Sequence, residues 1–169
     1  MSEIYRASNA TSAKVVNSYS LATSNEDDTL QEWAVKQIAS ILNNQPEKIE
    51  ILHKVLAGKP ALAVRRVCFG ALAEIESLAP KTLELAKAEV PENSGGKVKR
   101  RVIRILIKAP KTDLEIPGLL MVLATTGLSV KANNQAKKLL NEEWIHLPEV
   151  QTFLATHPQA SAAIAPSGD

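Results

Sequence analysis

The amino-acid sequence predicts an all-α protein assembled from pairs of helices that recur every 34 residues. Apolar residues follow helical spacing through most of the chain, and no window alternates with a period of two, so we expect no β-sheet. Prolines mark the repeat. Pro46 and Pro80 are 34 residues apart and Pro148 follows after another 68. Each opens an apolar segment, which suits the first turn of a helix because the N–H that proline lacks has no partner there.

Three apolar columns run in register with these prolines. Equivalent positions lie 34 residues apart in four successive units, and they form the sets Leu30, Val64, Val98 and Ala132; Ala34, Cys68, Val102 and Ala136; and Ile38, Leu72, Leu106 and Leu140. Within one unit the three positions are spaced by four residues, which places them on one face of a helix. We therefore expect each unit to contain a helix that buries this face.

The helices are expected, in chain order, at about 12–22, 26–43, 46–57, 60–77, 80–89, 96–109, 115–126, 129–143 and 148–157. The first is obtained by projecting the repeat backwards onto a segment with four large side chains, Val15, Val16, Tyr19 and Leu21. That segment is predicted to cap the repeat array. The alternative is an arm that packs on a neighbouring molecule.

Local signals define several of these helix ends. Ser24 is a candidate N-cap for the second helix, and Asp27 with Asp28 supplies negative charge in its first turn. Gly58 is expected to stop the helix that begins at the first marker proline. Ser129 is placed to cap the helix that follows it.

The segment from Pro117 to Ala124 is apolar nearly all round, which predicts a central, buried helix. Outside the helices the composition becomes polar or rich in Ala, Ser and Pro, which favours disorder. The predicted organisation is a flexible segment, a helical repeat domain and a disordered tail, at residues 1–11, 12–158 and 159–169.

The segment from Val64 to Ile75 resembles the inner helix of HEAT and armadillo-type repeats. In those repeats a Val-Arg pair precedes apolar residues four and five positions later and an Ala-Leu pair at seven and eight. The segment from Val98 to Leu106 keeps much of this pattern. The resemblance implies a short right-handed α-solenoid of about four 34-residue helix-turn-helix repeats, a class that binds partners along an extended face. An irregular helical bundle is the alternative fold.

No catalytic, metal or cofactor motif occurs in the sequence, so we expect a non-enzymatic protein without a cofactor. The single Cys68 occupies an apolar column, which predicts packing rather than a reactive thiol. Three histidines are expected at the surface or at helix ends: His53, His146 and His157. Neither an apolar stretch of about 18 residues nor a secretory leader is evident, so we expect a cytoplasmic protein.

The strongest local feature is a basic run from Lys97 to Lys111, which contains seven cations and no acid although the whole chain has a net charge of only +2. On a helical wheel five of these cations fall within an arc of about 100°, opposite the apolar column. The candidate binding residues are Lys97, Arg100, Arg101, Arg104, Lys108 and Lys111.

Two interpretations of the basic run remain open. An anionic partner would offset like-charge repulsion that costs roughly 1 kcal/mol along the helix. Alternatively the face is solvated or neutralised internally by nearby acids, namely Glu84, Glu89, Glu92, Asp113 and Glu115. The predicted function is a protein-binding scaffold or adaptor whose partner has an acidic surface. The alternative is a nucleic-acid-binding or nucleocapsid-like assembly protein that contacts phosphates through the same run, as an oligomer or a monomer.

Overall fold

The computed structural model describes residues 27–41, 46–126 and 129–157. Within these residues the chain forms eight α-helices and no strand, so the all-α prediction is confirmed. The helices are α2 (Asp28–Ile41), α3 (Pro46–Ala57), α4 (Leu62–Ala73), α5 (Pro80–Glu89), α6 (Gly96–Leu106), α7 (Glu115–Thr125), α8 (Val130–Glu143) and α9 (Pro148–Thr156). The predicted helix at 12–22, the capping role of Ser24 and the segments 1–11 and 159–169 lie outside the described residues.

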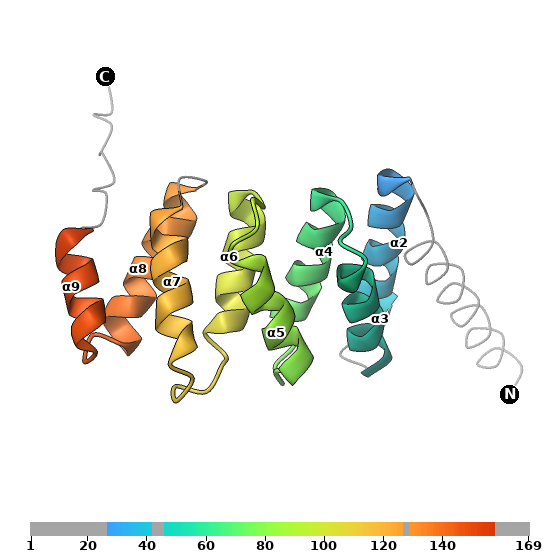
Figure 1. Cartoon of the computed structure of the whole chain (residues 1–169). Helices are drawn as coiled ribbons and strands as arrows, with labels where there is room; N and C mark the ends of the chain where they lie inside the picture. Colours follow the sequence, from blue (N-terminus) through green and yellow to red (C-terminus); the bar gives the residue numbers. More distant parts are fainter. Residues whose placement is uncertain (1–26, 42–45, 127–128, 158–169) are drawn as a thin grey trace, which may run out of the picture.

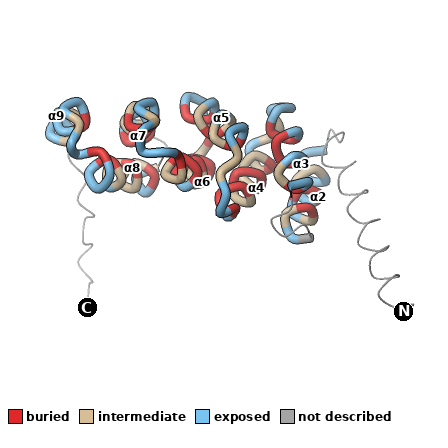
Figure 2. Tube along the Cα trace, turned by 90° about the horizontal axis from the view of Figure 1, so that it is seen from below, coloured by how far each residue is buried: buried red, intermediate tan, exposed pale blue. Residues whose placement is uncertain are grey.

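The eight helices form two layers (Figures 1 and 2). One layer contains the even-numbered helices, and each of them contacts the next: α2 with α4, α4 with α6, and α6 with α8. The other layer contains the odd-numbered helices, in which α3 contacts α5 and α7 contacts α9. Helices that follow one another in the chain therefore alternate between the layers, and the core lies between them.

The apolar columns predicted from the sequence form much of this core. Eleven of their twelve side chains are buried, and Leu30 is the exception at 45% exposure. Leu30 belongs to α2, the first helix of the even layer, which has no further described helix on its outer side. Phe69 and Trp144 add the two largest buried aromatic side chains.

The ends of α2, α3 and α8 lie at or next to the predicted signals. Asp27 caps α2, because its Oδ1 accepts hydrogen bonds from the backbone N–H groups of Thr29 and Leu30 at 2.8 and 3.2 Å. Ser129 caps α8 as predicted, since its hydroxyl accepts from the N–H of Ala132 at 3.3 Å. Helix α3 ends before Gly58, but the left-handed residue of this turn is Lys59, with φ of 49°.

Helix α7 differs from its prediction as a central buried helix. It lies in the odd layer, where Ile116, Leu120 and Leu123 face the core and Val122 is 45% exposed. A helix in an outer layer has only one side covered, whatever its composition. No helix among the described residues is both long and apolar enough to cross a membrane.

Candidate functional site

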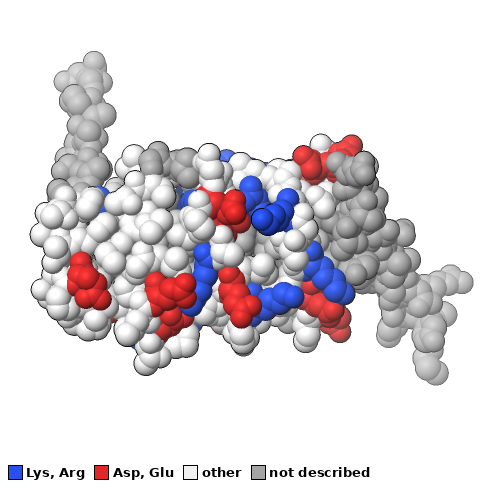
Figure 3. Space-filling view, in the orientation of Figure 1, with Lys and Arg blue, Asp and Glu red and all other residues white. Residues whose placement is uncertain are grey.

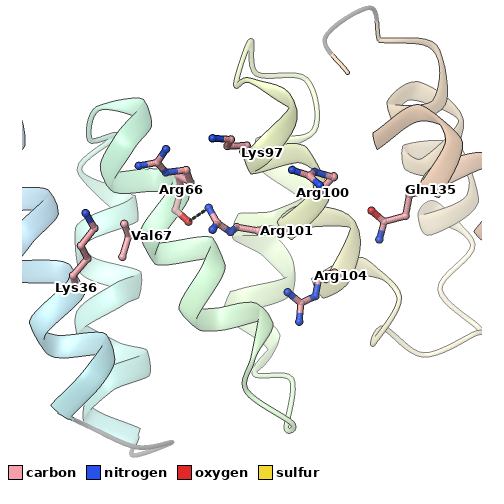
Figure 4. Close-up of a pocket in the computed structure, with 8 residues that line it drawn as sticks. All are labelled: Lys36, Arg66, Val67, Lys97, Arg100, Arg101, Arg104 and Gln135. Atoms are coloured by element: carbon pink, nitrogen blue, oxygen red, sulfur yellow. Dashed lines mark hydrogen bonds between the residues drawn. The ribbon is translucent and has the colours of Figure 1, made fainter. Parts of the chain in front are cut away.

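Four of the predicted binding residues meet two further cations at a surface hollow of about 610 Å³ (Figure 4). The hollow lies along the even layer, from α2 across α4 and α6 to α8. Its lining has six cations and no carboxylate, and we call it the basic hollow: Lys36, Arg66, Val67, Lys97, Arg100, Arg101, Arg104 and Gln135.

The 34-residue repeat explains why these side chains gather. Arg66 and Arg100 occupy equivalent positions of successive units, and so do Val67, Arg101 and Gln135. Because the helices that carry them lie side by side in one layer, equivalent positions become neighbours across helices. Sequence reasoning missed Lys36 and Arg66 as site residues. The signal that would have found Arg66 is its place 34 residues before Arg100.

Arg101 reaches across to α4, where its Nη1 donates a hydrogen bond to the backbone carbonyl of Arg66 at 2.8 Å (Figure 4). Gly70 makes room for this side chain, since a Cβ at position 70 would lie 3.0 Å from the Nε of Arg101. Burial lowers the pKa of Arg101, and the positive charges of Arg66, Arg100 and Arg104 lower it further. An anion in the hollow would relieve this repulsion.

Two carboxylates outside the lining partly neutralise the cations. Glu32 binds Lys36 at 2.9 Å and Arg66 at 3.0 Å, and its pKa is lowered chiefly by the hydrogen bond from Lys36. Glu74 binds Arg104 at 2.9 Å. These contacts show that carboxylates reach the ammonium and guanidinium groups of this surface in the folded protein.

Three of the acids that were expected to neutralise the basic run bind elsewhere. Glu89 pairs with Arg65 at 2.9 Å, while Asp113 and Glu115 both bind Lys87, at 2.8 and 2.6 Å. Their partners lie on α4 and α5 rather than on α6. Closeness in sequence to the basic run did not predict the ion-pair partners of these acids. They belong to α5 or to the chain after α6, and those segments face other neighbours.

Lys97 and Arg100 remain without a carboxylate partner in the described part of the chain. No ion pair or hydrogen bond joins either side chain to another described residue, and the Nε of Arg100 is buried without a hydrogen-bond acceptor. A buried N–H without an acceptor costs roughly 1–3 kcal/mol.

Lys108 and Lys111 do not line the basic hollow. Lys108 donates to the carbonyls of Ala73 and Ile75 at 2.7 and 2.6 Å, and so closes the C-terminus of α4. Lys111 binds Glu143 and lies 4.8 Å from the centre of the Trp144 ring. The predicted helix at 96–109 was too long: α6 ends at Leu106, so the helical arc that grouped Lys108 with the other cations no longer applies.

Lys99, in the same run, is fully buried. Its ammonium donates to the backbone carbonyls of Glu89, Val90 and Glu92 at 2.8, 2.6 and 2.6 Å. Burial lowers its pKa, against the opposing effect of the carboxylates of Glu89 and Glu92. Lys99 thus joins the end of α5 to α6 and is not available to a ligand.

The remaining candidate groups are the one cysteine and the three histidines. Cys68 is buried as expected, and burial raises its pKa to about 12. His53 is a correction: it is buried, and its Nε2 lies 2.7 Å from the hydroxyl of Thr82. His146 and His157 are exposed, as expected. The described residues contain no group of three or more His, Cys, Asp or Glu side chains that would hold a metal ion.

The opposite, odd layer has a different charge distribution. Figure 3 views the molecule from the side of α3, α5, α7 and α9, where blue and red side chains are interspersed and a large part of the surface carries no charge. A cluster of cations free of lining acids therefore distinguishes the even layer. Comparisons of the chain with models of known families, with curated proteins and with solved structures found no match.

Proposed function

We propose that the protein is a non-enzymatic binding module, a short α-solenoid of the HEAT and armadillo type, that holds an acidic segment of a protein partner in the basic hollow. The observation that carries this proposal is the gathering of six cations without a lining carboxylate, two of which, Lys97 and Arg100, have no acidic partner among the described residues. An α-solenoid uses one layer of helices as an extended binding face.

The energetics favour an anionic ligand. Within α6, Lys97 faces Arg101 and Arg100 faces Arg104 at a spacing of four residues, and each like-charge pair costs roughly 0.2–0.5 kcal/mol. A carboxylate between the helices reduces both repulsions. Arginine binds a carboxylate through two parallel N–H groups, which makes the guanidiniums of the hollow better suited to Asp and Glu side chains than ammonium groups would be.

The short extent of the hollow supports a protein partner over a nucleic acid. In α8 the positions equivalent to Arg100 and Arg101 are Asn134 and Gln135. Lysines stand at the positions equivalent to Lys97 and Arg104, but neither Lys131 nor Lys138 lines the hollow, so its cation cluster ends at α6. A nucleic-acid backbone is followed by a longer track of positive charge. A compact cluster is sufficient for a few consecutive acidic residues.

A second candidate is phosphate-backbone binding, and one observation favours it. Trp33 is 49% exposed on α2 and occupies the position equivalent to Val67 and Arg101 of the hollow. An exposed aromatic ring beside cations is the arrangement on which bases of single-stranded nucleic acids stack. In this alternative the protein is a nucleic-acid-binding or coat-like assembly protein.

The test is a fluorescence anisotropy titration of the full chain with a labelled peptide of ten Asp and Glu residues, and with single- and double-stranded nucleic acid, at two salt concentrations. The double variant Lys97→Glu, Arg100→Glu should abolish peptide binding without loss of helix content. The matched control, Lys54→Glu with Lys81→Glu on α3 and α5, changes the net charge equally and should bind like the unaltered protein.

Three results would contradict the proposal. The unaltered protein would fail to bind the peptide at low salt, or the control variant would lose as much affinity as the double variant. A steeply salt-dependent affinity for nucleic acid without affinity for the peptide would replace the first candidate with the second.

A further inference from the structure

A second, apolar depression of about 390 Å³ adjoins the basic hollow. It lies between the N-terminal ends of α4 and α6, and we call it the apolar slot: Leu62, Ala63, Arg66, Gly95, Gly96, Lys97 and Val98. Arg66 and Lys97 line both the slot and the hollow. Figure 4 shows these two side chains on neighbouring helices at one end of the hollow. The two depressions are therefore parts of one continuous surface.

The slot is open because glycine stands where a side chain would fill it. Gly95 has φ of −47° and ψ of 160°, a conformation that any residue adopts, so the backbone does not require glycine there. A Cβ at this position would lie 3.9 Å from the Cδ2 of Leu62, at ordinary contact distance. Leu62, a large apolar side chain, is 44% exposed at the other wall.

We infer that the apolar slot binds one apolar side chain of the acidic segment that the basic hollow holds. The inference rests on the proposed function and specifies its partner: a Leu, Ile, Met or Phe residue directly beside a run of Asp and Glu. The positive charges beside the slot explain why the apolar residue should have acidic neighbours. An apolar group that enters the slot passes the cations of Arg66 and Lys97, and these cations are neutralised when the neighbouring residues of the ligand are acidic. The apolar side chain supplies buried area, and the acids supply orientation.

The test compares labelled ten-residue peptides that are identical except at one position. One set carries Leu at the start or the end of an acidic run, and the other carries Ser at the same place. We expect the better-placed Leu peptide to bind about tenfold more tightly than its Ser counterpart, as burial of most of one side chain predicts. The variant Gly95→Leu should fill the slot and reduce the Leu peptide to the affinity of the Ser peptide, with the affinity for the Ser peptide unchanged.

The matched control is Gly118→Leu on α7, where an added Cβ meets no atom within 4 Å. It should bind both peptides as the unaltered protein does. Circular dichroism and urea unfolding show whether Gly95→Leu is folded. If it is not, Leu62→Ser provides the second variant, since its side chain is partly exposed and its loss removes one apolar wall; it should also abolish the preference for Leu.

The outcomes separate this inference from the proposed function. Equal affinity for the Leu and Ser peptides at both placements, with binding still lost in the Lys97→Glu, Arg100→Glu variant, overturns the apolar slot and leaves the proposed function standing. Loss of both affinities in Gly95→Leu also overturns it, because the substitution then acts through the basic hollow. Absence of binding to every acidic peptide overturns both.

Discussion

Replacing Lys99 by Met tests whether the buried lysine, rather than the exposed ones beside it, holds α6 in place. Met keeps the length of the aliphatic stem and removes the ammonium that donates to three backbone carbonyls. Two of these carbonyls keep another bond, because the N–H groups of Glu92 and Ser94 donate to Glu89 and Glu92. The carbonyl of Val90 has no other donor in the described structure.

The expected change in the free energy of unfolding follows from the hydrogen bonds lost and the one carbonyl left without a donor. A hydrogen bond from a charged donor is worth roughly 1.5–3 kcal/mol net, and an orphaned buried carbonyl costs roughly 1–3 kcal/mol. Removal of the buried charge returns part of the desolvation cost that burial of Lys99 imposes. We expect Lys99→Met to lower the free energy of unfolding by about 3 kcal/mol, a large part of the roughly 5–15 kcal/mol of a typical domain.

The assay is urea unfolding followed by circular dichroism at 222 nm, with Lys97→Met as the control. Lys97 is two residues earlier in the same helix and exposed, so its replacement should change the free energy of unfolding by no more than about 0.5 kcal/mol. The reasoning is refuted if Lys99→Met costs less than about 1 kcal/mol, or if the two variants are equally destabilised.

Three further predictions concern helix ends and pH. Ala61 is the N-cap of α4 and provides no side-chain hydrogen bond, so Ala61→Ser should raise the free energy of unfolding by about 1 kcal/mol, and no gain in urea would contradict the cap. Lys59→Gly should give a similar gain of about 1 kcal/mol, because φ of 49° strains any residue with a Cβ; a loss would show that the side chain matters more than the strain. The hydrogen bond from Lys87 holds the pKa of Asp113 below its ordinary value of 3.8, so this pair stabilises the fold fully above pH 3.8 and less as the pH falls through the lowered pKa. Lys87→Met should therefore make the loss of stability on acidification less steep, as measured by urea unfolding across that range. An unchanged pH profile would show that this pair does not contribute to the pH dependence of stability.

His53 shows where sequence patterns mislead about individual side chains. The residue follows the buried Leu52 in α3, and nothing in its local sequence distinguishes an exposed imidazole from a buried one. Burial lowers its pKa, followed in effect by the charge of Lys81. The structure supplies its hydrogen-bond partner, Thr82, from a helix 29 residues away. Such a partner is invisible to periodicity because it depends on how α3 and α5 meet.

The helices themselves were largely predictable. A 34-residue spacing of prolines and apolar columns is a local, repeated property, and most helix bounds agree with it to within a few residues. The end of α6 was not predictable in this way, because the basic pattern continues to Lys111 whereas the helix ends at Leu106. A run of basic residues does not show where the backbone hydrogen bonds of a helix end. The helical wheel therefore placed Lys108 on a face where it does not lie.

The sequence by itself determined the all-α class, the buried columns and the one-sided charge of α6, since each depends on residues within one or two turns of the same helix. Only the tertiary structure decided which cations meet. Arg66 of α4 and Arg101 of α6 come together because these two helices pack side by side in one layer. Lys108 points away from them because a carbonyl at the end of α4 lies within its reach. Long, flexible side chains have several possible partners, and only folding decides which of them lie within reach; the basic hollow follows from that selection.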